Sequence, residues 1–147
     1  MILVALALGC AGPTVRDAMP RGTEVRVTMP ERLPRTTLLA ADVVELGALL
    51  RAEVEAGLMA RGCVKEGGAP GAPRLEVEVQ AADASDLAPS RRMRFRVRVA
   101  LVQGGAPRWA DELEGTTHVP GPAGLALRGH VVVLAQQVLA RLPGCAP

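Results

Sequence analysis

Arginine and apolar side chains alternate strictly over residues 92–99. The arginines are Arg92, Arg94, Arg96 and Arg98, and the apolar residues on the other side of the strand are Met93, Phe95, Val97, Val99 and, after Ala100, Leu101. A period of two residues is that of a β-strand with one wet face and one buried face. This stretch therefore predicts a sheet that is covered on one side only, which restricts the chain to folds with a half-exposed sheet.

The surrounding sequence supplies the other elements of such a fold. Alternation recurs at residues 25–29, 75–81 and 109–118, and in the last of these Trp109 and Leu113 share the buried side. Apolar residues recur at steps of three and four over residues 37–61 and 127–142, which predicts two amphipathic helices. Gly62 is the natural end of the first helix. The expected order is strand, helix, three strands, helix.

These elements predict an α+β two-layer sandwich. Because each connection reverses the chain, a four-stranded mixed sheet carries two parallel helices on one face. At 147 residues the chain has room for one ordinary core. We assign residues 22–147 to a single domain.

The arginine row has two interpretations. In a meander, the arginine strand lies between strands whose outward faces carry Glu76 and Glu78 on one side and Glu112 and Glu114 on the other. Opposite charges facing each other across strands stabilise the sheet and fix its register, so a self-neutralising wet face is the favoured interpretation. A binding role stays open for Arg91, Arg92 and Arg94, near the loop, where acidic partners run out.

The first residues are typical of an export signal. The apolar run from Ile2 to Leu8 is followed by Gly9 and Cys10, and it is too short to span a bilayer as a helix. This segment resembles a bacterial lipoprotein signal, which implies cleavage after residue 9, a lipid on Cys10 and a tether over residues 10–21. Ala11 after the cysteine implies release to the outer membrane. The alternative is a buried N-terminal strand.

Two further cysteines each follow a glycine at the end of a predicted helix. Cys63 follows Gly62, and Cys145 follows Gly144. Parallel helices on one sheet face end at the same edge, within reach of the Cα separation of roughly 4.4–6.8 Å that a disulfide needs. The periplasm that the signal implies is oxidising. We therefore predict a Cys63–Cys145 disulfide; two idle thiols are the alternative.

Catalysis and nucleic-acid binding find no support. His118 and His130 are the only histidines, and neither has the neighbours of a metal or nucleophile site; both are expected on the surface. No catalytic residue, metal ligand or cofactor is predicted. With one Phe, one Trp, no Tyr and a net charge of +2, the chain lacks the stacking surface and positive field of a nucleic-acid binder.

The layout resembles that of the LPS-assembly lipoprotein family of the outer membrane: Cys10, a strand, a long helix, an Arg/Glu-rich meander and a final helix ending Val-Leu-Ala-Arg-Leu at residues 138–142. The resemblance implies a non-catalytic, lipid-anchored adaptor at the periplasmic face of the outer membrane, bound to an integral membrane or transporter protein. Two alternatives stay open: a periplasmic lipid- or glycan-binding module, and an auxiliary lipoprotein of a lipid-transport ABC system.

Overall fold

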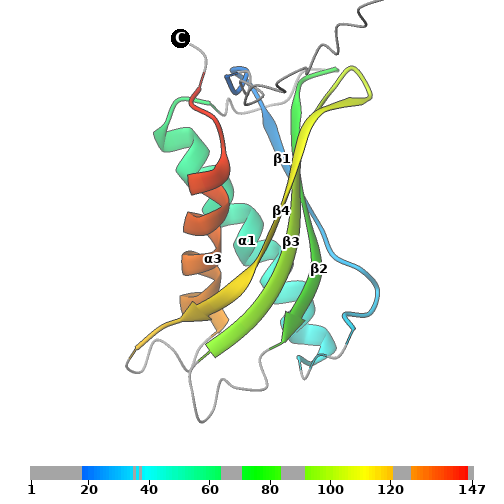
Figure 1. Cartoon of the computed structure of the whole chain (residues 1–147), viewed down its shortest axis with the longest axis vertical. Coiled ribbons are helices and arrows are strands. Elements are labelled where there is room, and N and C mark those ends of the chain that lie inside the picture. The colour runs from blue at the N-terminus through cyan, green and yellow to red at the C-terminus, as the bar shows by residue number, and fades with distance from the viewer. Residues whose placement is uncertain are drawn as a thin grey trace, which may run out of the picture.

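In the part of the chain that the structure describes, two helices pack side by side on one face of a four-stranded sheet (Figure 1). This computed structural model describes residues 18–34, 36, 38–63, 71–83, 92–120 and 127–145. The elements follow in the order β1 (Glu24–Thr28), α1 (Ala40–Ala60), β2 (Arg74–Asp83), β3 (Arg92–Gln103), β4 (Ala106–His118) and α3 (Leu127–Arg141). The predicted α+β sandwich and its element order are confirmed.

The sheet is mixed and keeps the strands in chain order, β1-β2-β3-β4. β1 runs parallel to β2, with Val25 opposite Leu75. β2 and β3, and β3 and β4, are antiparallel. Both helices run from the lower to the upper end of the view in Figure 1, so they are parallel to each other, as predicted. Their last turns therefore lie at the same end of the molecule.

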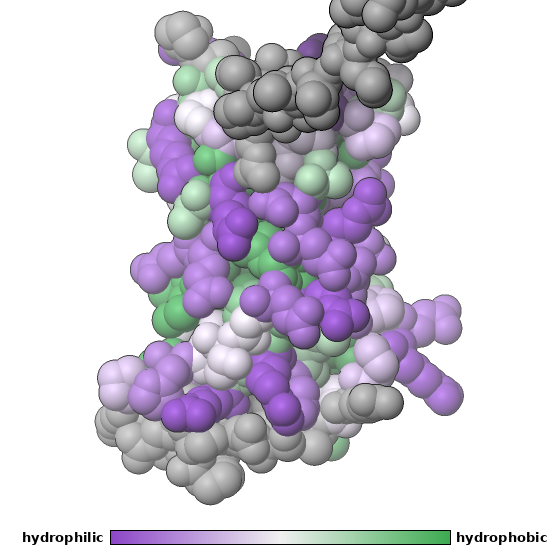
Figure 2. Space-filling model, in the orientation of Figure 1, coloured by the Kyte–Doolittle hydropathy of each residue, from purple (hydrophilic) through white to green (hydrophobic). Residues whose placement is uncertain are grey.

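The core lies between the helices and the inward face of the sheet. α1 buries its predicted apolar stripe from Leu46 onward, but the stripe was predicted to start at Leu39, which precedes the helix and is 71% exposed. α3 buries its stripe, and alternate residues of β3, and of β2 as far as Val79, are buried against the helices. The main contributors are Leu46, Leu50, Val54 and Leu58 of α1, Val131, Leu134 and Val138 of α3, and Leu75, Val77, Val79, Met93, Phe95, Val97 and Val99 of the sheet. Seen from the α3 and β4 side, the surface is mostly polar, with an apolar strip between α3 and the sheet (Figure 2).

The boundaries of α1 have local causes. At its start, the Leu39 N–H donates a hydrogen bond of 3.0 Å to the Asp42 carboxylate. At its end, Gly62 has a φ of 74°, a left-handed conformation that a residue with a Cβ rarely adopts. The Gly62 N–H bonds the Met59 carbonyl and the Cys63 N–H bonds the Leu58 carbonyl, which is the Schellman arrangement. This turn directs Cys63 inward immediately after the helix.

Candidate functional site

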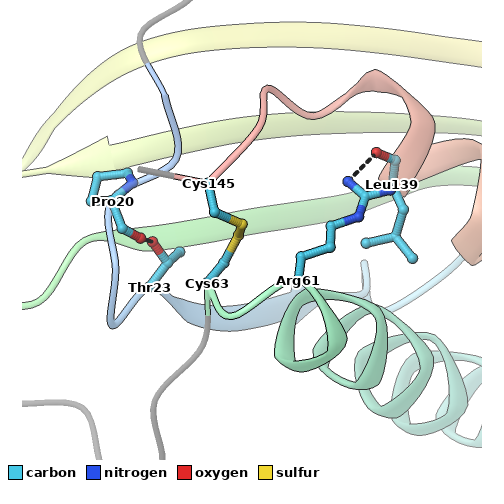
Figure 3. Close-up of a disulfide and its surroundings, with 6 residues drawn as sticks. All are labelled: Pro20, Thr23, Arg61, Cys63, Leu139 and Cys145. Atoms are coloured by element: carbon cyan, nitrogen blue, oxygen red, sulfur yellow. Dashed lines mark hydrogen bonds between the residues drawn. A yellow bond between two sulfur atoms is a disulfide. The ribbon is translucent and has the colours of Figure 1, made fainter. Parts of the chain in front are cut away.

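A disulfide between Cys63 and Cys145 joins the ends of the two helices (Figure 3). Their Cα atoms are 5.4 Å apart and 82 residues separate them in sequence. Cys63 is fully buried. Beside the disulfide, an Arg61 guanidinium N–H donates a 3.0 Å hydrogen bond to the Leu139 carbonyl, which ties the same two helix ends a second time. The pairing predicted from the topology is the one in the structure.

The start of the described chain joins the same cluster. The Met19 N–H donates to the Gly144 carbonyl at 2.7 Å, and Met19 forms an isolated parallel bridge with Cys145. The Cys63 carbonyl accepts hydrogen bonds from the Gly22 and Thr23 amides. We call this cluster, the disulfide with residues 18–23 and 61–63 and 142–145, the clamp. It binds the N-terminal entry of the domain to the ends of both helices.

The wet face of the sheet carries the predicted charge pairing. Arg98 lies opposite Glu78 on one side and Glu112 on the other. Arg96 pairs with both glutamates of β4, at 3.6 Å from Glu112 and 3.4 Å from Glu114. These side chains are half exposed or more, so each pair contributes at most about 1 kcal/mol. The self-neutralising interpretation of the arginine row is confirmed.

The expectation that acidic partners run out near the loop is wrong at Arg94. A register shift between Val79 and Ala81 places Asp83 opposite Arg94, and their side chains form a 3.1 Å ion pair. The extra residue in β2 brings Asp83 opposite Arg94, a pairing that the regular alternation of the sequence did not predict. Arg92 is exposed opposite His118, and Arg91 lies outside the described residues. A ligand role for these three arginines stays a prediction.

His130 is buried, and the prediction of a surface position is wrong. Its side chain is fully enclosed, with Nδ1 2.7 Å from the Thr117 Oγ1. The Thr117 hydroxyl also lies 3.3 Å from the Met93 carbonyl, so it can donate there and accept from Nδ1–H. The signal was in the sequence: residue 130 falls on the apolar stripe of α3, and Thr117 shares the inward side of β4 with Leu113. His118 is exposed, as expected.

A groove opens at the side of the molecule formed by β1 and α1. It has a volume of about 700 Å³ and is lined mainly by aliphatic side chains: Val27, Met29, Leu33, Leu38, Val43 and Val44. Val44 in this lining is 73% exposed, and Leu39, next to Leu38 in sequence, is 71% exposed; exposed apolar surface of this kind marks interaction sites when it forms a patch. We call it the β1–α1 groove. No sequence pattern pointed to it, because it depends on how the segment after β1 crosses the first turns of α1.

Among the described residues, no group of histidines, cysteines and acids is placed to hold a metal ion. Neither α1 nor α3 is both long enough and apolar enough to cross a membrane, within that same part of the chain. Cys10, the predicted cleavage site and most of the predicted tether lie outside the described residues.

Comparisons with known proteins bear on the fold. No family model matches the sequence, and no curated protein matches it either. Among solved structures, a PelC dodecamer from Paraburkholderia phytofirmans matches with a TM-score of 0.54 and 18% identity, over 87% of this chain and 92% of that one. A candidate lipoprotein from Caulobacter crescentus CB15 matches with a TM-score of 0.42 and 16% identity, over 78% and 85%. Neither comparison singles out the LPS-assembly lipoproteins.

Proposed function

We propose that this protein is a non-catalytic lipoprotein of the bacterial cell envelope, held by a lipid on Cys10, that serves as an accessory subunit of a larger assembly. The observation that carries the proposal is the Cys63–Cys145 disulfide. Structural disulfides persist in oxidising compartments such as the periplasm. Two of the three cysteines are thus accounted for, which leaves Cys10, in its signal-like context, for the lipid.

The fold supports a structural role. The PelC chain that shares it is a dodecamer, so this architecture is compatible with repeated subunits. More specifically, we propose a place at the periplasmic face of the outer membrane, in lipid or lipopolysaccharide transport or assembly, with an integral membrane or transporter protein as partner. No cofactor and no nucleic acid enter this proposal.

The glycan-binding alternative rests on the arginine row, and the ion pairs on that row weaken it. Arg94 and Arg96 each have carboxylate partners within 3.6 Å. A ligand would have to displace those carboxylates before it could use the guanidinium groups. We therefore favour the accessory-subunit role.

Fractionation of a Cys10→Ala protein tests the proposal. The variant should move from the membrane fraction to the soluble periplasm and lose incorporation of labelled palmitate, because three acyl chains on one cysteine anchor a protein firmly while none leaves it free. The matched control is the Cys63→Ala/Cys145→Ala protein, which should stay with the membrane and keep the label. If the parent protein carries no label and fractionates like Cys10→Ala, the anchor does not exist.

A pull-down of the parent from detergent-solubilised membranes tests the assembly part. Recovery of an integral membrane protein in a defined ratio is expected. Recovery of neither a partner nor further copies of the chain would contradict the accessory role.

A further inference from the structure

Both edges of the sheet are open in the described part of the chain. β1 pairs only with β2 and β4 pairs only with β3. β4 is 13 residues long, and a long open edge is a ready template for another strand. Within one chain these two edges cannot pair with each other, because β2 and β3 lie between them.

The β1 edge has an aliphatic groove beside it that could receive side chains of an added strand. Alternate side chains of a strand laid beside β1 would point toward the helix layer, where the β1–α1 groove offers the aliphatic surface of Val27, Met29 and Val43. This is the usual geometry of recognition by strand addition, in which the main chain gives affinity and pockets take alternate side chains. The exposed Val44 lies on the same side of α1 as the groove that it lines.

The charges of the wet face indicate which strand would fit. The row through Arg26 runs to Glu76 of β2, Ala100 of β3 and Ala110 of β4, and the next row runs from Thr28 to Glu78, Arg98 and Glu112. Arg26 is exposed and has no ion pair with any described residue, while Glu24 on the same face of β1 lies opposite Arg74. Glu112 or Glu114 on β4 of a second copy, laid beside β1, would give Arg26 a carboxylate partner.

We propose that copies of this chain associate head to tail, with β4 of one copy adding to β1 of the next. The inference rests on the proposed role as an assembly subunit and names the assembling surface. The contact is heterologous, because it joins two different surfaces, the β4 edge of one copy and the β1 edge of the next. Repetition of this contact gives a ring or an open chain of subunits. Both open edges are then covered.

The helix layer would continue in the same direction. The step that joins the edges brings α3 of one copy to the flank of α1 of the next. The apolar strip between α3 and the sheet (Figure 2) lies on the side that would meet Val44, which is 73% exposed. Apolar surface on one copy would therefore meet apolar surface on the next.

Cysteine cross-linking of the full-length protein tests the edge contact. Thr28 of β1 and the β4 residues Ala110 and Thr116 are exposed, and Thr28→Cys would be paired with Ala110→Cys or with Thr116→Cys to sample two registers. Within one chain the two edges are about 14 Å apart, three strand spacings of roughly 4.8 Å, which no disulfide spans. A bond between the two introduced cysteines is therefore between chains, and peptide mapping identifies it.

We expect mild oxidation to give a ladder of dimers, trimers and larger species from at least one double variant and not from the single variants. Dimers from a single variant, with no ladder from either double variant, would show an edge pairing with its own copy and overturn the proposal. So would the absence of any cross-link together with a monomer mass by native mass spectrometry. Folding is verified by the intact Cys63–Cys145 bond, and unchanged membrane fractionation shows that the anchor survives, so the proposed function and this inference fail separately.

A second pair of variants tests the helix contact. Val44→Asp should weaken self-association at least tenfold, while Met59→Asp, at the opposite end of α1 and also exposed, should leave it within about twofold. Both sites are exposed, so neither change should unfold the domain. Equal association of the two variants would overturn the placement of α3 of the next copy against α1.

Discussion

The clamp and the β1–α1 groove lie at opposite ends of α1 and differ in how much of their surface is buried. At the clamp, Cys63 is buried, its carbonyl accepts two backbone hydrogen bonds, and a disulfide closes the cluster. At the groove, Leu39 and Val44 are mostly exposed and aliphatic surface stays uncovered. At the clamp, the polar groups form hydrogen bonds within the chain and the cysteines are bonded to each other. At the groove, apolar side chains stay exposed and available to a second molecule.

This difference separates the residues that should stabilise the folded domain from those that should stabilise its association with another molecule. The domain does not need the groove filled in order to fold, because its core lies between the helices and the sheet. We expect the clamp to stabilise the domain, because its disulfide joins residues 82 positions apart in sequence. Changes at the clamp should therefore alter the free energy of unfolding, and changes at the groove should alter association.

Loss of the disulfide is expected to have the largest effect on this contrast. Cys145→Ser should lower the free energy of unfolding by about 4–5 kcal/mol, the loop-entropy value for a sequence separation of 82. Urea denaturation of the non-reduced protein measures it. Cys10→Ala keeps the disulfide and serves as the control. Equal midpoints for Cys145→Ser and the parent would contradict a stabilising clamp.

The buried His130–Thr117 contact lies at the end of the molecule opposite the clamp. Its loss should lower the free energy of unfolding by an intermediate amount. Thr117→Val removes the 2.7 Å contact between the Thr117 hydroxyl and His130 Nδ1, which should cost about 1–3 kcal/mol. Thr116→Val, one residue away on the exposed face, should change stability by less than about 0.5 kcal/mol. If thermal denaturation finds the two variants alike, the contact does not stabilise this end.

The smallest effect is expected on the wet face. Arg96→Ala removes two ion pairs with half-exposed partners, so stability should fall by no more than about 1 kcal/mol. The loss should shrink further at high salt, because exposed charges are screened. Denaturation at two ionic strengths measures both. A loss that is larger and independent of salt would mean that Arg96 contributes to packing and not to charge pairing.

Most of the fold could be predicted from the sequence, because the two-residue period of a strand and the 3.6-residue period of a helix show which side chains are buried. The strand at residues 92–101, the stripe of α3 and the stripe of α1 from Leu46 onward are present as predicted, and the parallel helices brought Cys63 and Cys145 together. What failed depended on local irregularity or on partners from distant segments. The shift between Val79 and Ala81 gave Arg94 a partner in Asp83, and His130 could be buried because Thr117 of another element supplied a hydrogen-bonding atom. The groove had no periodic signature at all.

The backbone bridge between Met19 and Cys145 has a mechanical consequence for a tethered protein. A pull on the N-terminal segment enters the domain at Met19 and passes at once to the last residues of the chain. From there the disulfide carries it to Cys63 and the end of α1. If the protein is tethered through its N-terminus, part of the load would therefore reach both helix ends through backbone hydrogen bonds and the disulfide before it reaches β1.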